Sequence, residues 1–266
     1  MTTNKAHEVL HEIARLFEDP ERLVGGMAAT FIRATGDRPI DNWSWGNRML
    51  AWLNNTVDAR TFNQWRTAGR SIQRGAKAFC ILAPCTYKVK KEDEDQDAVE
   101  KVKVVGFRAV PVFRIQDTDG AVIRTYEPPT LPPLSEVPKK WGIMVDYEPI
   151  PGEAFGIRGS YNFEKKQITL FTENQSTFFH ELLHAADDRI SPLKGGQQPD
   201  QEAVAELGAA VLARLYGGRI DRQAWEYIKV YHNDPAQAVR RLLPRVGACL
   251  SLILNAAGYG AELVPY

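Results

Sequence analysis

Residues 176–185 read Ser-Thr-Phe-Phe-His-Glu-Leu-Leu-His-Ala and contain the pattern His-Glu-x-x-His at His180, Glu181 and His184. On an α-helix, positions i and i+4 lie on one face, so both imidazoles can bind the same metal ion. The glutamate between them would lie beside a metal-bound water, where it can accept a proton. The stretch therefore predicts a helix that carries a metal site.

The same five-letter pattern occurs near the start of the chain, at residues 7–11. That copy lies in a polar amphipathic stretch without a preceding strand. The acids that follow at 18–21 are too close in sequence to fold back easily onto the helix. The copy at 180–184 instead follows an apolar, β-branched run and precedes an acid-bearing helical run at 200–212. We interpret the first copy as a solvent-exposed helix face and the second as the metal site.

The segment before the second copy predicts a place for a peptide. Residues 166–171 read Lys-Gln-Ile-Thr-Leu-Phe, a short β-branched and apolar strand entered from residues 161–163. A peptide can add to a sheet by pairing with the backbone of an edge strand. We therefore treat 166–171 as a candidate edge strand beside the site.

The third ligand must come from outside the pattern. The extended three-histidine motif is absent, because Asp187 and Ile190 stand at the places of its glycine and its last histidine. Two histidines and one carboxylate form a known catalytic zinc set. We favour Glu202, 18 residues after His184 (202 − 184). Glu206, one turn later, is expected to hydrogen-bond the outer ring nitrogen of a ligating histidine. Three aspartates remain alternative ligands: Asp187, Asp188 and Asp200.

This ligand set predicts a zinc-dependent metallopeptidase with one catalytic Zn²⁺. Two imidazoles and a carboxylate leave a fourth coordination position for water, whose pKa falls from about 15.7 to about 7 on zinc. Glu181 is the expected catalytic base, which accepts the proton of that water and returns it to the leaving amine. Tyr161 is a candidate donor to the transition state, and core packing is its alternative role. The substrate is expected to be a protein or peptide of unspecified sequence.

Composition narrows the class of protein. The chain has 266 residues, with 33 Lys and Arg against 33 Asp and Glu, so it has no overall charge to attract nucleic acid or a membrane. No apolar run suits a membrane span and no targeting leader opens the chain, so we expect no membrane partner. Cys80, Cys85 and Cys249 lack paired-ligand spacing, which is typical of reduced thiols in a cytoplasmic protein.

A proline-rich stretch at 126–138 predicts an extended linker. It would join an N-terminal domain, 1–125, to a C-terminal domain, 139–266. We expect an α+β fold of two domains, with helices and a β-hairpin or small sheet in the first. The second is expected to be zincin-like, with a small sheet, the motif helix and the acid-bearing helix. The expected helices are 6–17, 20–34, 43–54, 61–67, from about 175, 201–216 and two more ending near 257, and the later strands are 143–147, 157–163 and 167–171.

The N-terminal half is locally basic. Residues 33–91 hold eleven basic and three acidic residues, with aromatic residues interleaved. Cations for phosphates and aromatic faces for bases are the combination that single-stranded nucleic-acid binders use. Two observations oppose this interpretation: Trp45, Met49 and Trp52 have the spacing of a helix core, and the acidic run 92–97 offsets the charge as a hairpin tip. The expected DNA-binding residues are Arg66, Arg70, Arg74, Lys77, Trp43 and Trp65.

Short segments in both halves of the chain form a recognisable set: 65–78, 81–84, 110–118, 160–161, 167–168, 179–184 and 202–210. Together they resemble the ArdC-type antirestriction proteins of plasmids and phages. The resemblance implies a single-stranded-DNA-binding domain joined to a zinc-metallopeptidase-like domain, and a role in protecting incoming DNA from host restriction. The chain departs from the family after the second histidine, at 185–187, and before the acidic motif, at 199–200. These departures concern substrate recognition more than metal ligation.

Two other functions stay open. The protein could be a non-catalytic DNA-binding antirestriction protein in which the metal only stabilises the fold. It could also be a peptidase whose N-terminal half binds protein instead of DNA. The role of Glu181 separates the first of these from a peptidase, and binding to single-stranded oligonucleotides tests the second.

Overall fold

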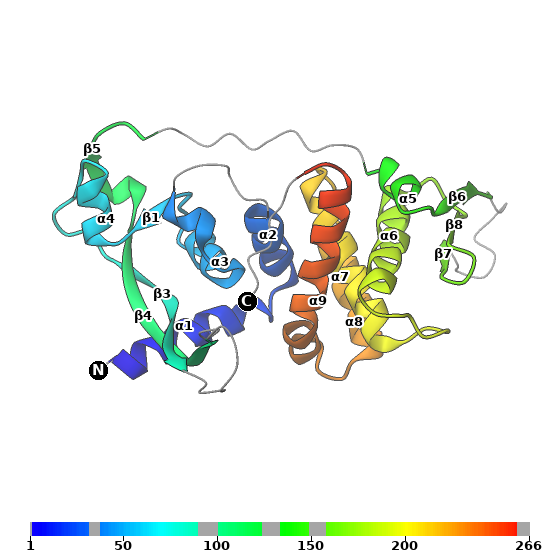
Figure 1. Cartoon of the computed structure of the whole chain (residues 1–266), viewed down its shortest axis with the longest axis horizontal. Helices are drawn as coiled ribbons and strands as arrows, with labels where there is room; N and C mark the ends of the chain where they lie inside the picture. Colours follow the sequence, from blue (N-terminus) through cyan, green and yellow to red (C-terminus); the bar gives the residue numbers. More distant parts are fainter. Residues whose placement is uncertain (1, 32–37, 90–100, 124–133, 149–157, 260–266) are drawn as a thin grey trace, which may run out of the picture. The chain divides into compact units, whose positions relative to one another are not determined.

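A computed structural model of the chain describes residues 2–31, 38–89, 101–123, 134–148 and 158–259. It has the expected α+β class, with helices and small sheets (Figure 1). The chain forms two compact units. Unit 1 comprises Met1–Arg15 and Ala34–Tyr126, and unit 2 comprises Leu16–Arg33 and Glu127–Tyr266.

The described helices of unit 1 are α1 (Thr2–Leu16), α3 (Trp45–Leu53) and α4 (Phe62–Thr67), with a short 3₁₀ helix η1 (Pro39–Asn42). Polar residues cap the free backbone N–H groups at the start of α3 and α4. Ser44 accepts a hydrogen bond from the backbone of Asn47 at the start of α3. Thr61 and Gln64 form a reciprocal capping box at the start of α4. These caps explain where the two helices begin.

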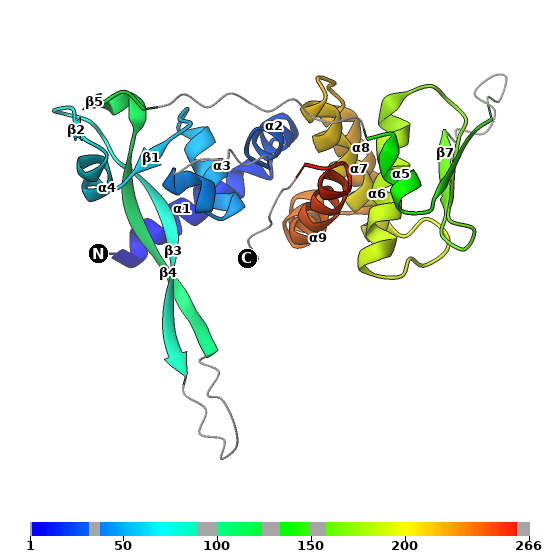
Figure 2. The same cartoon turned by 45° about the horizontal axis from the view of Figure 1, so that its top comes forward.

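The sheet of unit 1 has the strand order β1 (Ala59–Arg60), β4 (Lys101–Arg114), β3 (Phe79–Val89), all antiparallel. Strands β3 and β4 form the predicted hairpin, a long twisted ribbon (Figure 2). Its expected acidic tip, 92–97, lies outside the described residues. A separate pair joins β2 (Arg70–Ile72) to β5 (Thr118–Gly120), with the 3₁₀ helix η2 (Ile115–Asp117) before β5. The core of the sheet consists of Ala59, Ile81 and Val112.

The sheet of unit 2 corrects one prediction. Its order is β6 (Met144–Tyr147), β8 (Gln167–Leu170), β7 (Gly159–Asn162), with β8 parallel to β6 and antiparallel to β7. The run 166–171 is therefore the central strand, and treating it as an edge strand was wrong. The physical reason is that β8 pairs on both sides and Ile168 is fully buried. Among the described strands, β6 and β7 form the two edges of this sheet.

The described helices of unit 2 are α2 (Pro20–Phe31), α5 (Glu136–Lys140), α6 (Gln175–Ile190), α7 (Pro199–Leu215), α8 (Asp221–Tyr231) and α9 (Pro235–Ala256). Four of them surround α7. Helix α7 contacts α2, α6, α8 and α9, and its alanine-rich sequence is buried around most of its circumference. No described helix is both long and apolar enough to cross a membrane.

The division of the chain differs in two places from the predicted division at the linker, 126–138. Helix α2 belongs to unit 2, because its apolar residues Leu23, Val24 and Met27 are buried and the helix packs against α7 and α8. The last residues of the predicted linker, 136–138, form the start of α5. Pro138 fits there because the first helical turn does not use its N–H group. Residues 126–133 of the linker lie outside the described part of the chain.

Helices α6 and α7 approach each other closely at Leu183 and Gly208. A Cβ atom on Gly208 would lie 2.5 Å from Cδ1 and 2.7 Å from Cγ of Leu183, so a larger residue does not fit there. Both positions lie near the predicted ligands in sequence. The glycine therefore brings the two ligand-bearing helices together.

Two ion pairs tie α9 to these helices. Arg245 binds the fully buried carboxylate of Asp187 on α6 with two nitrogens, and one of these contacts is 2.7 Å. Arg241 binds Asp200 at the start of α7 in the same bidentate manner, at 2.6 and 2.7 Å. A buried carboxylate is tolerated only when it is paired in this way. These pairs fix the position of α9 along α6 and α7.

Candidate metal centre

The side chains of His180, His184 and Glu202 converge between α6 and α7. The two Nε2 atoms of the histidines are 3.0 Å apart. The Glu202 carboxylate lies 3.6 Å from Nε2 of His180 and 3.8 Å from Nε2 of His184. Ligands at about 2.0–2.1 Å from a tetrahedral ion are about 3.4 Å apart, so this donor set has the spacing that a divalent ion requires.

In the part of the chain that the structure describes, no other group of three such residues is close enough to share an ion. The first copy of the pattern differs accordingly. Its Glu8 and His11 are exposed on α1, and the side chain of His7 lies outside the described part. The two copies have the same letters, and the difference between them is the carboxylate that α7 places beside the second.

Glu206 lies on the outer side of His180. Its Oε1 is 3.2 Å from Nδ1 of that histidine, one helical turn from Glu202 on α7. A carboxylate at the outer nitrogen holds the ring orientation and directs the other nitrogen toward the ion. This is the place that sequence spacing indicated for Glu206.

The expected catalytic base, Glu181, is buried against strand β7. Its carboxylate accepts a hydrogen bond from the backbone N–H of Tyr161. A Cβ atom on Gly159 would lie 2.8 Å from Cγ2 of Thr177 and 3.0 Å from Oε1 of Glu181. Glycine at 159 therefore leaves the space in which Glu181 lies. The sequence alone does not single out Gly159, because one glycine in a short strand carries no distinctive signal.

The charges and burial of the cluster shift the pKa values of the two histidines in opposite directions. Burial alone would lower the pKa of His180, but the carboxylates of Glu202 and Glu206 raise it to about 10. Burial and the charge of His180 lower the pKa of His184 to about 4. Burial, with the nearby carboxylates, raises the pKa of Glu181 to about 7 although His180 opposes the shift. Without a metal, these shifts favour an imidazolium at His180 and a neutral imidazole at His184.

The tyrosine expected as a transition-state donor is engaged elsewhere. The hydroxyl of Tyr161 donates to Oδ2 of Asp188 at 2.9 Å, and Lys166 pairs with the same oxygen. Burial and this hydrogen bond raise the pKa of Tyr161. The contact corresponds to the packing role that the sequence left as the alternative for Tyr161.

The three alternative aspartate ligands do not join the histidines. Asp188 binds Tyr161 and Lys166, and the other two hold α9 through its arginines. The physical reason is charge pairing, since each carboxylate already has a cation at contact distance. The donor group of the described structure therefore contains Glu202 and none of these three aspartates.

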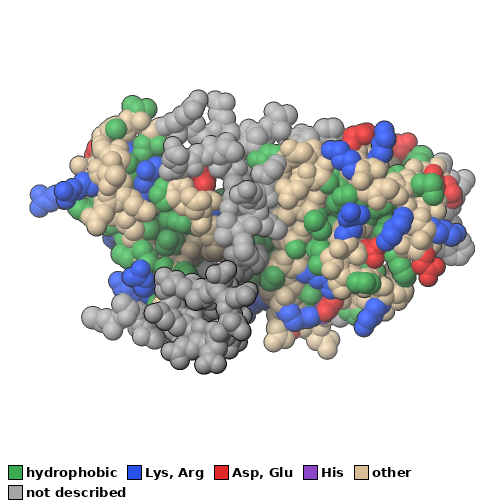
Figure 3. Space-filling model, in the orientation of Figure 1, with side chains coloured by type: hydrophobic (Ala, Val, Ile, Leu, Met, Phe, Trp, Pro, Cys, Tyr) green, Lys and Arg blue, Asp and Glu red, His purple; other side chains and the backbone are tan. Residues whose placement is uncertain are grey.

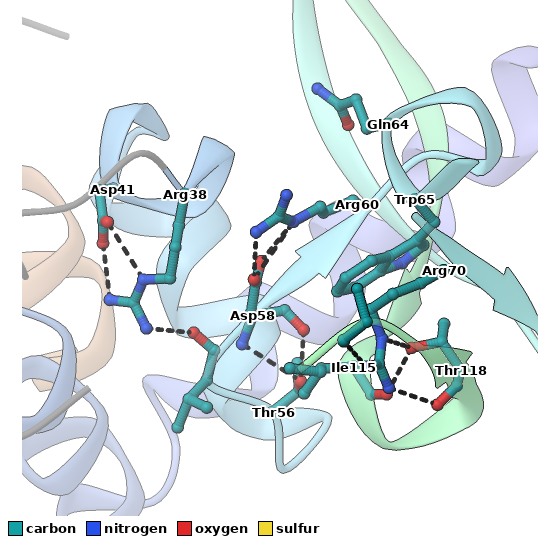
Figure 4. Close-up of polar contacts among 12 residues, drawn as sticks. Arg38, Asp41, Thr56, Asp58, Arg60, Gln64, Trp65, Arg70, Ile115 and Thr118 are labelled. Atoms are coloured by element: carbon teal, nitrogen blue, oxygen red, sulfur yellow. Dashed lines mark hydrogen bonds and ion pairs between the residues drawn. The ribbon is translucent and has the colours of Figure 1, made fainter. Parts of the chain in front are cut away.

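Two of the expected DNA-binding residues have structural roles in unit 1. Trp65 is fully buried, and its indole N–H donates to the backbone oxygen of Phe113 at 2.8 Å. Its ring is not available to stack on a base. The Arg70 guanidinium donates to the side chain and backbone of Thr118 and to the backbone of Ala121, which ties β2 to β5 (Figure 4). Trp43 is half-buried and packs against the sheet core.

The other expected cations are on the surface. Arg66, Arg74 and Lys77 are exposed, and basic side chains are visible on the face of unit 1 in Figure 3. Phe62 is 58 % exposed and lies one helical turn before Arg66 on α4. The i, i+4 spacing of an aromatic residue and an arginine was visible in the sequence, but exposure could not be read from it.

Metal binding at this site is expected to depend on pH. At about pH 8, His180 holds a proton that the ion must displace, so binding should release about one proton and affinity should rise with pH. Calorimetric titration with Mn²⁺ or Zn²⁺ in buffers of different ionisation enthalpy measures this release. An affinity that does not change between about pH 6 and pH 8 would contradict the protonation described here.

Substitution of Gly159 is expected to disturb the seat of Glu181. Gly159→Ala places a Cβ against the buried Thr177 and should lower the free energy of unfolding by about 1–3 kcal/mol through overpacking. Gly195→Ala is the matched control, because no atom lies within 4 Å of its new Cβ. Chemical denaturation compares the two. If the two variants have equal free energies of unfolding, β7 accommodates the added methyl group without loss of stability, and the prediction is wrong.

No protein-family model matches the sequence, and no curated protein matches it either. Among solved structures, the chain is similar to two crystal structures of the antirestriction protein ArdC from plasmid R388. The metal-free structure is 17 % identical, with 90 % of this chain and 94 % of that chain covered and a TM-score of 0.47. The Mn(II)-bound structure is 15 % identical, with 91 % and 98 % covered and a TM-score of 0.53. The chain therefore has the ArdC-type fold, which extends over both of its units.

Proposed function

We propose that the protein is a metal-dependent peptidase with Zn²⁺ as its ion. The convergence of His180, His184 and Glu202 beside a buried glutamate is the observation that carries this proposal. Two nitrogens and a carboxylate form a donor set of catalytic zinc. The ion would supply Lewis acidity, which lowers the pKa of water to about 7 and polarises a carbonyl group. One of the ArdC structures with this fold is Mn(II)-bound, which supports a divalent ion for this protein as well.

The protein's own residues supply the proton transfer. Glu181 would accept a proton from the attacking water and return it to the leaving amine. Without an ion, burial raises the pKa of Glu181 to about 7, so its surroundings favour the uptake of a proton. The backbone N–H of Tyr161 and the space at Gly159 keep the carboxylate in place.

Strand β7 is the proposed position of the substrate. It is an edge of the three-stranded sheet of unit 2, and it carries the backbone that contacts Glu181. An extended peptide that pairs with an edge strand is held by main-chain hydrogen bonds. A peptide paired with β7 would thus lie beside the catalytic base. Strand β7 therefore takes the role of peptide-binding edge strand that the sequence suggested for 166–171.

Glu181→Gln is expected to abolish peptide cleavage and to retain metal binding. The amide cannot accept the proton, so the rate should fall by about 10²–10⁴-fold, while the ligands are untouched. Cleavage of a fluorogenic peptide library and metal titration measure the two effects. Glu164→Gln, on the exposed turn after β7, is the matched control. Cleavage that survives Glu181→Gln would disprove the proposed role of Glu181.

We also propose an antirestriction role in which unit 1 binds single-stranded DNA. The ArdC-type fold and the exposed cations Arg66, Arg74 and Lys77 support this proposal. Phe62 takes the place of Trp65 as the aromatic face for a base, because Phe62 is exposed and Trp65 is not. If Glu181→Gln protects DNA as well as the unmodified protein, the function is the alternative one, with a structural metal.

Removal of the three exposed cations is expected to weaken DNA binding. Each phosphate contact on a single strand contributes about 0.7 to the slope of log affinity against log salt, so Arg66→Ala/Arg74→Ala/Lys77→Ala should lower that slope by about 2. Fluorescence anisotropy with a labelled oligonucleotide at several salt concentrations measures it. The control is the same treatment of exposed cations in unit 2, Lys165, Lys194 and Arg222. An unchanged slope, or no binding by the unmodified protein, would favour a protein partner for unit 1.

A further inference from the structure

The third ligand has a neighbour that lies outside both motif helices. The hydroxyl of Tyr227, on α8, donates a hydrogen bond to the carboxylate of Glu202. We propose that Tyr227 is a positioning residue that holds Glu202 in the orientation needed to bind the ion. This inference rests on the proposed metal site and adds a residue that neither His-Glu-x-x-His nor the acidic run contains.

The packing of α8 gives this hydroxyl a defined place. Helix α8 lies against α7, and its Ala224, Trp225 and Ile228 are buried. Tyr227 is one turn after Ala224 and next to Ile228, so it borders the buried face and is itself half-buried. A tyrosine at this border can keep its ring in the helix contact and direct its hydroxyl to a polar group.

The Glu202 carboxylate needs such a partner. Glu202 is only 7 % exposed, so little water is available to solvate its oxygens. One oxygen faces His180 at 3.6 Å and the other faces His184 at 3.8 Å. An ionised carboxylate has about four positions that accept hydrogen bonds or a metal, and a buried one loses free energy for those left empty. The Tyr227 hydroxyl fills one of them and restricts rotation of the group.

Tyr227 and Glu206 thus have equivalent positions around the site. Glu206 contacts the outer nitrogen of His180, and Tyr227 contacts the third ligand. Groups that orient metal ligands in this way typically change metal affinity by about 10–100-fold when they are removed. Removal of the Tyr227 hydroxyl would therefore lower metal affinity directly, and it would lower peptide cleavage only as a consequence.

Tyr227→Phe tests the proposal because it removes only the hydroxyl. We expect about 10-fold weaker binding of Zn²⁺, measured by competition with a chromophoric chelator, and a similar loss for Mn²⁺. Tyr147→Phe is the matched control, since it removes a hydroxyl on β6 that donates to Glu173, which is not a ligand. It should change the affinity by less than about 2-fold. Equal affinities of Tyr227→Phe and the unmodified protein would overturn the proposal and leave the metal site intact.

A double-mutant cycle separates positioning from packing. If Tyr227 acts through Glu202, Tyr227→Phe should cause no further loss of affinity in a Glu202→Ala background. A loss of the same size in both backgrounds would assign Tyr227 a general structural role and overturn the proposal. Failure of the unmodified protein to bind either ion, or unchanged binding after His184→Ala, would instead refute the metal site and the inference with it. Thermal unfolding of the metal-free variants confirms that each one is folded.

Discussion

The close contact of α6 with α7 is the constraint on which the candidate site depends. Two ligands come from α6 and one from α7, so their separation is set by the distance between the helices. At Gly208 a single added carbon would lie 2.5 Å from Leu183. This contact lies one residue before His184 and two after Glu206, and it brings imidazole and carboxylate to metal-binding distance. The small residues of α7 also allow four helices to pack around it, which gives the acids a largely dry surrounding.

Four acids of α6 and α7 form two pairs with different partners. Glu202 and Glu206 face the histidines, whereas Asp187 and Asp200 face the arginines of α9. A carboxylate in a poorly solvated place needs a cation, and it takes the one that packing brings into contact. The arginine pairs of Asp187 and Asp200 hold α9 against the ligand-bearing helices. These two aspartates therefore support the positions of Glu202 and Glu206 without contacting an ion. Tyr227 extends this support to α8.

In unit 1, several of the arginine and tryptophan side chains that suggest a nucleic-acid surface instead stabilise the fold. Trp65 fills the core, Arg60 lies over its ring at 4.8 Å and pairs with Asp58, and Arg70 ties two strands together (Figure 4). Arginine and tryptophan serve both purposes, so a count of them overstates the binding surface. What remains exposed is a smaller set, with Phe62 and Arg66 on one face of α4. Our proposal for DNA binding rests on this set.

The sequence by itself determined the features that depend on local geometry. The motif helix, the acid-bearing helix and the hairpin follow from periodicity, and two histidines at i and i+4 share a face in any α-helix. Only the tertiary structure decided the features that depend on distant contacts. These are the central place of β8, the position of α2 in unit 2, the burial of Trp65 and the contact of Tyr227 with Glu202. The physical reason is that strand order and burial arise from residues far apart in the chain, which periodicity does not encode.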